Sequence, residues 1–414
     1  MNNKIYVWLF GLFLCSSNIQ AAYWTDSGNY DASWYSDLFS TFELSTPRQL
    51  AGLAFLINNG KSFSEKSIKI TSNIDMNEHE WSPITSFDGV FDGDFHKISN
   101  LHLEITSSST ALIQCCFVIN NNGVIKNTMF DNVTYHAYSP HVKIGGVAVL
   151  NKGEISNCIV SGILKGEPQD SYSHYYCCGG ISSENEGIIE NCTFIGSVTS
   201  LASRNGNYVS TIAGGIAGEN KGKVINCINR SAVYAYGSRY SGQEGTYAGG
   251  IAGVSSGTIR NVINSENVRA EHNSYTGNVY AGAIVASNSG TVDYAYTHSS
   301  LIVEAPVIEQ TGMQILYSQF NNETYEFTTL LNSNVTSIGN SELSFWCNSP
   351  EKYDNTPMIL DGFLIDDIDY SVTMNTVTLS ASPGEIHSSA ISEKGFAIKK
   401  EGETEFGAPG FFRG

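Results

Sequence analysis

The chain has 414 residues, enough for about two or three domains and a sizeable core. Hydrophobic residues make up 41% of it and charged residues 15%, which excludes a largely disordered chain. The 22 Lys and Arg against 40 Asp and Glu give a net charge of −18, which argues against nucleic acid as a partner.

Residues 1–21 have the pattern of a cleaved secretory signal. Lys4 supplies a short positive start, residues 5–14 form an apolar run, and Ala21 closes a cleavage site. The run is too short to span a bilayer and no later run of about 18 apolar residues follows, so we expect no transmembrane segment. Lipidation of Cys15 is the less favoured alternative, because a bulky leucine precedes it. We therefore predict a secreted or cell-surface protein, on the exterior of the outer membrane.

An amphipathic helix is predicted over residues 44–60. Ser45 is its expected N-cap, Pro47 lies in its first turn and Gly60 ends it. A helix at the start of a strand-rich stack would cover the open end of the core. Together with the segment that follows, it forms a predicted N-terminal unit over residues 22–110.

The densest polar cluster lies in that following segment and comprises Asp88, Asp92, Asp94 and His96. Paired carboxylates could perform acid–base chemistry on a glycan, or bind Ca²⁺ through oxygen atoms. Asp-Gly pairs at 88–89 and 92–93 are also typical of turns. We favour turns and predict no metal site and no cofactor, with Asp88, Asp92 and Asp94 as the residues to test for a metal.

A repeated phrase organises the middle of the chain, over predicted boundaries of 111–345. Its anchor glycines recur at steps of 30, 34, 35, 35 and 33 residues: Gly123, Gly153, Gly187, Gly222, Gly257 and Gly290. Eight residues before five of these anchors stand further glycines: Gly145, Gly179, Gly214, Gly249 and Gly282. Cys115-Cys116 takes the place of the first such pair. Eleven residues after each anchor stands Thr134 or an aliphatic residue: Leu164, Val198, Val233, Val268 and Leu301.

The repeat predicts strands rather than helices, because β-branched residues recur at short intervals between Gly and Asn with almost no Pro. One unit cannot bury its apolar face alone, whereas stacked units bury a continuous core. We predict a right-handed parallel β-helix of about six units. A blade-type propeller is the alternative, with a usual repeat of about 40–50 residues that fits less well.

Two polar columns keep register with the anchors. The first is an asparagine column, expected at a bend where Asn tolerates positive φ and bonds the neighbouring coil: Asn127, Asn157, Asn191, Asn226 and Asn261. The second contains Cys158, Cys192 and Cys227, and shares its position with Thr, Val and Ala in other units. This exchange predicts buried free thiols rather than disulfides or a zinc site.

Tyrosine is concentrated where the units differ in length. The five variable segments, 135–144, 165–178, 199–213, 234–248 and 269–281, hold 12 of the 22 tyrosines. Insertions at one register of a solenoid collect on one face, which is often the binding face. The candidate ligand-binding residues are Tyr172, Tyr175, Tyr208, Tyr236, Tyr240 and Tyr275. The alternative is that Tyr serves as a strand residue in the scaffold, above all Tyr247 and Tyr280.

The repeat ends near residue 345. An end cap and acidic linker are predicted over 346–370, followed by a strand over 371–379 that opens a partial β-sandwich-like module over 371–414. About 44 residues are too few for a whole sandwich domain of roughly 100 residues.

The compound motif over 81–101 and the Gly-Gly-Ile-Ala-Gly phrases at 214–218 and 249–253 resemble the GLUG-repeat surface proteins of gut bacteria. The resemblance covers roughly residues 40–350, and the tail is similar to the start of a fibronectin-type module. It implies a secreted or surface-exposed β-helix, often described as adhesin-like, with no established chemistry. Some relatives are attached to IgA-cleaving metallopeptidases, whose His-Glu-x-x-His motif is incomplete at His79-Glu80 because the second histidine is missing.

Function is expected to be non-catalytic. We predict an adhesin-like binding protein that recognises a glycan or a host protein through tyrosine-rich loops on one face of the β-helix. The alternatives are a polysaccharide-degrading lyase or hydrolase, and a structural stalk for a C-terminal partner. An aligned set of carboxylates in a groove would favour the enzyme, and exposed aromatic side chains would favour binding.

Overall fold

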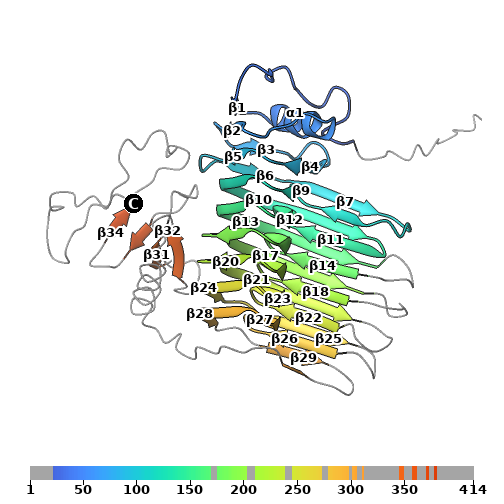
Figure 1. The fold of residues 1–414 in the computed structure, drawn as a ribbon, viewed down its shortest axis with the longest axis vertical. Helices are drawn as coiled ribbons and strands as arrows, with labels where there is room; N and C mark the ends of the chain where they lie inside the picture. Colours follow the sequence, from blue (N-terminus) through green and yellow to red (C-terminus); the bar gives the residue numbers. More distant parts are fainter. Residues whose placement is uncertain are drawn as a thin grey trace, which may run out of the picture.

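The computed structural model describes residues 22–168, 175–202, 210–237, 245–272 and 278–297, together with a few short strands from residue 301 onward. Strands dominate these residues, and they stack as successive coils of a parallel β-solenoid (Figure 1). The predicted parallel β-helix fold is therefore confirmed.

The N-terminal unit begins with β1 (Thr41–Leu44), α1 (Pro47–Asn58), β2 (Ser67–Ile70) and β3 (Ile74–Asp75). Helix α1 confirms the predicted cap, but its N-cap is Thr46, not Ser45. Thr46 Oγ1 accepts the N–H of Gln49 at 3.3 Å, whereas Ser45 donates its own N–H to Gln49 Oε1 at 2.9 Å. Thr46 thus caps the helix with its side chain, and Ser45 accepts no such bond but is held by the Gln49 side chain. The sequence offers a hydroxyl residue at both positions and does not distinguish the two roles.

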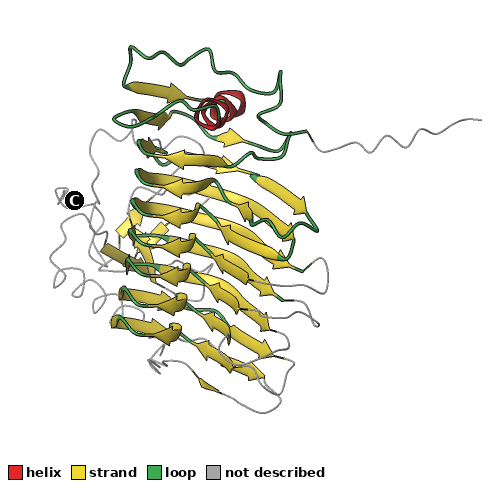
Figure 2. Ribbon diagram, turned by 45° about the vertical axis from the view of Figure 1, so that its right-hand side comes forward, coloured by secondary structure: helices red, strands yellow, loops and turns green. Residues whose placement is uncertain are grey.

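Helix α1 lies across the end of the stack (Figure 2). Its buried residues are Leu50, Ala51, Gly52, Leu53, Ala54 and Ile57. A Cβ on Gly52 would lie 2.0 Å from the carbonyl oxygen of Asp31, so the chain before β1 crosses the helix at direct backbone contact. The helix is thus packed between the N-terminal segment and the first coil, where Asn58 Oδ1 accepts the N–H of Thr85 at 2.9 Å.

Three long parallel sheets form the stack. Sheet 1 has sixteen strands: β1, β2, β3, β5 (Val90–Asp92), β6 (Lys97–Ser99), β7 (His102–Thr106), β10 (Val124–Tyr138), β13 (Glu154–Glu167), β16 (Ile188–Glu190), β17 (Thr193–Leu201), β20 (Lys223–Ile225), β21 (Ile228–Gly237), β24 (Thr258–Asn264), β25 (Val268–His272), β28 (Thr291–Thr297) and β29 (Leu301–Glu304).

Sheets 2 and 3 have seven strands each. Sheet 2 contains β8 (Ile113–Cys115), β11 (His141–Gly145), β14 (Tyr175–Gly179), β18 (Ser210–Gly214), β22 (Gly245–Gly249), β26 (Asn278–Gly282) and β30 (Gln310–Thr311). Sheet 3 contains β4 (Ile84–Phe87), β9 (Val118–Asn121), β12 (Ala148–Asn151), β15 (Ser182–Asn185), β19 (Ala217–Asn220), β23 (Ala252–Ser255) and β27 (Val285–Asn288).

The register confirms the glycine columns from the second unit onward. Gly145 pairs with Gly179, and the column continues through Gly214 and Gly249 to Gly282. At the anchors, a Cβ on Gly187 would lie 2.0 Å from the carbonyl oxygen of Gly153. Only glycine fits there, because successive coils touch through their backbones.

The first unit departs from the predicted alignment in two places. Cys115 pairs with Ile144, so the cysteine pair does not replace Gly145-Gly146, and this corner is one residue shorter. A bulge after Phe130 shifts the next column, so Tyr135 rather than Thr134 pairs with Leu164. Tyr135 is consequently a fully buried core residue, not a member of a loop.

The asparagine column lies at positive φ as predicted. The φ angles of its five members run from 50° to 56°, and Tyr294 takes the sixth position at 51°. Each side-chain amide donates to the preceding coil: Asn157 donates to Asn127 at 3.0 Å, and Asn191 donates to Asn157 at 3.0 Å. A second ladder, fully buried, runs through Asn121, Asn151, Asn185 and Asn220 at 2.8 Å per step.

The seven cysteines between residues 115 and 227 are buried free thiols. Cys158, Cys192 and Cys227 form the predicted column, and each Sγ donates to a backbone carbonyl two residues earlier at 3.1 to 3.2 Å. Burial raises the pKa of the Cys192 thiol well above its ordinary value.

Four short strands are described near the C-terminus. β31 (Phe345–Asn348) pairs with β32 (Pro357–Leu360), and β33 (Tyr370–Val372) pairs with β34 (Val377–Leu379), both antiparallel. The single strand predicted over 371–379 is therefore two strands. Among the residues described, no helix has the length and apolar character to cross a membrane.

Candidate functional site

The strand ends that flank the tyrosine-rich segments after residue 165 lie along one edge of the stack. The segments connect the ends of β13, β17, β21 and β25 in sheet 1 to the starts of β14, β18, β22 and β26 in sheet 2. Those ends are in register, since Leu201 pairs with Tyr236 and Tyr175 pairs with Ser210. The strand ends that flank the segments consequently repeat at the coil spacing of about 4.8 Å. Tyr172, Tyr208, Tyr240 and Tyr275 lie outside the described residues.

The other eight of the twelve tyrosines lie on strands. Tyr135 and Tyr176 are fully buried, which corrects their assignment to variable segments. The remaining six are half-buried: Tyr138, Tyr175, Tyr234, Tyr236, Tyr247 and Tyr280. Their positions support the strand interpretation for part of the tyrosine excess.

Tyr175, a predicted ligand residue, is engaged within the protein. Its hydroxyl donates to Glu219 Oε1 at 2.5 Å, and Lys143 Nζ lies 5.6 Å from its ring centroid. One coil away, Lys143 Nζ forms an ion pair with Glu184 Oε1 at 2.6 Å. Burial, and then the neighbouring Glu219 carboxylate, raise the pKa of the Tyr175 phenol, so it remains protonated.

These pairs bridge the outer faces of sheets 2 and 3, and we call this boundary the seam. Beneath them Cys177 is fully buried, with its Sγ donating to Ser183 O at 3.3 Å. A Cβ on Gly218 would lie 2.5 Å from that sulfur. The seam is therefore closed by side chains packed on backbone, and its polar groups lie along its rim.

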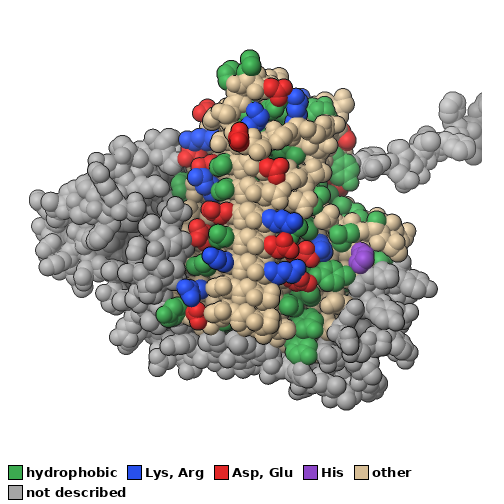
Figure 3. Space-filling view, in the orientation of Figure 1, with side chains coloured by type: hydrophobic (Ala, Val, Ile, Leu, Met, Phe, Trp, Pro, Cys, Tyr) green, Lys and Arg blue, Asp and Glu red, His purple; other side chains and the backbone are tan. Residues whose placement is uncertain are grey.

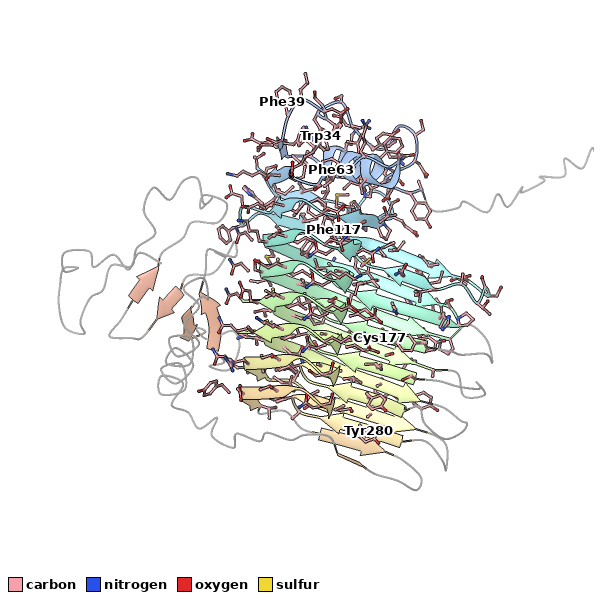
Figure 4. The ribbon with its side chains drawn as sticks, in the orientation of Figure 1. Trp34, Phe39, Phe63, Phe117, Cys177 and Tyr280 are labelled. Carbon is pink, nitrogen blue, oxygen red and sulfur yellow. The ribbon has the colours of Figure 1, made fainter. Side chains whose placement is uncertain are left out.

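Figure 4 labels Tyr280 farther along the stack than Cys177. Tyr280 stacks on Tyr247 with ring centroids 5.0 Å apart and an interplanar angle of 4°. They come from β22 and β26 and are direct partners in the register. Each ring therefore covers one face of the other. The faces that the two rings turn to each other are consequently not open for stacking on a sugar ring.

Sheet 1 carries a second group of polar contacts near the roots of the variable segments. Tyr234 donates to Glu271 Oε2 at 3.0 Å, and the Arg269 guanidinium lies 5.6 Å from the Tyr234 ring centroid. Burial and the Glu271 carboxylate raise the pKa of Tyr234. Tyr236, the other described candidate, is half-buried beside this cluster, in the register position between Leu201 and Glu271.

A similar cluster surrounds Glu167 at the end of β13. Its carboxylate contacts Lys165 Nζ at 2.6 Å and His136 Nε2 at 3.0 Å. Burial alone would raise the pKa of Glu167, but these hydrogen bonds outweigh it and lower that pKa. The roots of the segments are thus held by local charge pairs.

The aspartates of the lead segment lie in a turn. Asp92 Oδ1 accepts the N–H of Asp94 at 2.9 Å and the side-chain amide of Asn127 at 3.0 Å, which places Asp92 at the head of the asparagine column. Asp94 pairs with Lys69 at 3.0 Å, and the exposed Asp88 accepts from Asn122 at 2.7 Å. Within the described ranges, no three His, Cys, Asp or Glu side chains are placed to hold a metal ion.

Comparison with known proteins supports the fold. No protein-family model matches the chain, and no curated protein matches it. Among solved structures, it is similar to a crystal structure described as a "putative immunoglobulin A1 protease" from Bacteroides ovatus. The identity is 18% and the TM-score 0.50, with 77% of this chain and 92% of that chain covered.

Sequence analysis missed the seam. Glu184 and Glu219 each stand three residues before an anchor glycine, and Lys143 and Cys177 each stand two residues before a glycine of the other column. These offsets were a usable signal, because positions at a constant offset align in a stack. What the offsets could not show is that the two columns face each other across the boundary of two sheets.

Proposed function

We propose that this protein is a secreted or cell-surface, adhesin-like binding protein without catalytic activity. It recognises a glycan or a host protein surface through the edge of the solenoid that bears the tyrosine-rich segments. The secretory pattern of residues 1–21 and the resemblance to GLUG-repeat surface proteins support this location and role.

One observation provides the main support. The strands on both sides of the four variable segments after residue 165 keep strict register, so the points where these segments rich in Tyr, Ser, Gly and Asn begin and end lie at one edge, coil after coil. Such mixtures are typical of antibody-like recognition surfaces, where Tyr gives broad contact at low entropic cost. The net charge of −18 disfavours anionic ligands, so a neutral glycan or a basic protein patch is preferred.

The test is a glycan and host-glycoprotein array with two matched variants. The first replaces Tyr172, Tyr208, Tyr240 and Tyr275 with Ala, and the second replaces Tyr175 and Tyr234, which are hydrogen-bonded on strands, with Ala. We expect the first to lose most binding with little change in unfolding midpoint, and the second to keep binding and lose stability. Full binding by the first variant, or an array without any ligand, would contradict the proposal.

The proposed location at the cell surface is tested by a separate experiment. The mature protein should begin after Ala21, and antibody or protease added to intact cells should reach it. Mass spectrometry of the N-terminus and cell-surface proteolysis test both points. Protein that is protected in intact cells, with residues 1–21 retained, would contradict a surface location.

A polysaccharide-degrading enzyme is the second candidate, favoured by Glu184 and Glu219. They are register partners on neighbouring coils, so their backbones are about 4.8 Å apart along the stack, and retaining glycosidases use two carboxyl groups about 5–5.5 Å apart. Their existing bonds to Lys143 and Tyr175 favour a structural role instead. A folded Glu219→Gln variant that loses a measurable polysaccharide-degrading activity of the parent would establish the enzyme.

A further inference from the structure

The first strand of the stack has an open edge. β1 is the terminal strand of sheet 1 and pairs with β2 on one side only. Ser67 N donates to Ser40 O at 2.7 Å and Thr71 N donates to Leu44 O at 2.9 Å, so even-numbered residues of β1 face β2. Thr41 and Glu43 therefore direct their N–H and C=O groups away from the stack. Both side chains are exposed, and no hydrogen bond of these groups occurs in the described part of the chain.

Charge alternates along the outer column that ends at this edge. Glu43 is the register partner of Lys69, Lys69 of Asp92, and Asp92 of Lys126. The sequence of signs is negative, positive, negative, positive, and Figure 3 shows acidic and basic side chains in rows along the stack. A strand added beyond β1 would continue the alternation by placing a Lys or Arg beside Glu43.

Apolar side chains stand beside the open edge. Leu38 is 91% exposed and Phe39 62% exposed, more than any other large hydrophobic side chain in the described residues, and both lie within three residues of the start of β1. Their turn is held in place, since Lys66 Nζ donates to Phe39 O at 3.0 Å and Lys61 pairs with Asp37 at 3.0 Å. Exposed apolar residues fixed next to unpaired backbone are typical of sites where a strand is added.

We propose that the free edge of β1 binds an extended segment of a partner protein in which apolar and basic residues alternate. The partner's backbone pairs with Thr41 and Glu43, its basic side chain pairs with Glu43, and its apolar side chains cover Leu38 and Phe39. The chain contains a precedent for this fit, because β2 presents Ser-Ile-Lys-Ile to the opposite edge with Lys69 beside Glu43. This interaction is independent of the tyrosine-rich edge.

The probe is a labelled peptide that repeats the Ser-Ile-Lys-Ile alternation, titrated into the whole protein by fluorescence anisotropy. We expect saturable binding that becomes about fivefold weaker in Glu43→Lys, and no change in Glu78→Lys, which makes the same charge change at an exposed site outside β1. A peptide with Glu in place of Lys should bind Glu43→Lys better than the parent. Equal affinity of both peptides for both proteins, or absence of binding, would overturn the proposal.

A backbone variant keeps the test decisive if charge reversal disturbs folding. Thr41→Pro removes an outward N–H that has no partner, which edge strands tolerate, so it should keep the unfolding midpoint and lose peptide binding. Light scattering without peptide identifies the competing occupant. A dimer that Glu43→Lys or Thr41→Pro converts to a monomer would mean that a second copy occupies the edge, and would overturn the partner assignment.

Discussion

The N-terminal unit and the repeat stack solve the same packing problem with different side chains. The N-terminal unit buries large rings, among them Trp24, Phe63, Trp81 and Phe91, whereas the later coils bury mainly Ile, Val, Ala and Cys. In the stack each residue lies on its own counterpart about 4.8 Å away, so one small set of sizes fills every layer. The N-terminal unit has no such counterpart and fills irregular space with aromatic side chains. The repeat therefore restricts the size of the side chain at each core position of the stack. The N-terminal unit, which lies outside the repeat, is free of that restriction.

The largest effect is expected where the two regions meet. Phe117 stacks on Trp81 with ring centroids 5.3 Å apart and also contacts Phe130 at 5.0 Å. Phe117→Ala should lower the free energy of unfolding by about 3–5 kcal/mol, because the cavity cannot be filled by a neighbouring repeat. The same change at a fully buried ring within the stack, Phe194→Ala, should cost less, about 3 kcal/mol at the lower end of this range. Equal losses in urea titrations would contradict the distinction between the regions.

Coil-to-coil contact at the anchor glycines gives the next effect. Gly187→Ala places a Cβ 2.0 Å from a backbone oxygen, and we expect a loss of about 3 kcal/mol from the resulting overpacking. Gly60 is the control, since it has φ of +89° but no atom within 4 Å of an added Cβ. Gly60→Ala should cost only about 1 kcal/mol from backbone strain. Similar unfolding midpoints for both variants would show that close approach is not the limiting factor.

The asparagine column should respond more moderately. Asn157 donates an amide hydrogen bond to Asn127 and accepts one from Asn191, and its φ is 50°. Asn157→Ala should cost about 2 kcal/mol, from lost hydrogen bonds and from positive φ. Asn157→Gly restores the backbone freedom and should recover about half of that loss. A glycine variant as unstable as the alanine variant would assign the whole effect to the amide ladder.

Acid should produce the smallest effect. The folded-state pKa of Glu167 is lowered from its ordinary value of 4.5, so its contribution to stability is present above that pH and is lost as pH falls below it. We expect the loss to stay below about 1 kcal/mol, because exposed and half-buried pairs contribute little. Glu167→Gln should flatten the decline of the urea midpoint between pH 6 and pH 3. A parallel decline in both proteins would exclude Glu167 as a source.

The repeat made most of the fold predictable. Glycine spacing gave the correct register for every unit after the first, and the exchange of Cys158 with Thr, Val and Ala predicted a buried column. The failures lie where periodicity ends: the bulge that moves Tyr135 inward and the N-cap at Thr46 depend on local geometry. The candidate site was harder, because composition shows where tyrosines gather but not that Tyr175 is bonded across the seam to Glu219.

The asparagine ladders also define how the molecule would bear force. Their amide bonds, like the backbone bonds of the three sheets, run along the axis of the stack from one coil to the next. Tension applied between the two ends loads these interfaces in series, so the weakest interface opens first and the remaining coils stay intact. Tension applied across a single coil is instead shared by every bond above and below it. Resistance to pulling is thus directional, low along the stack and high across it, and the direction of attachment sets how much load the protein withstands.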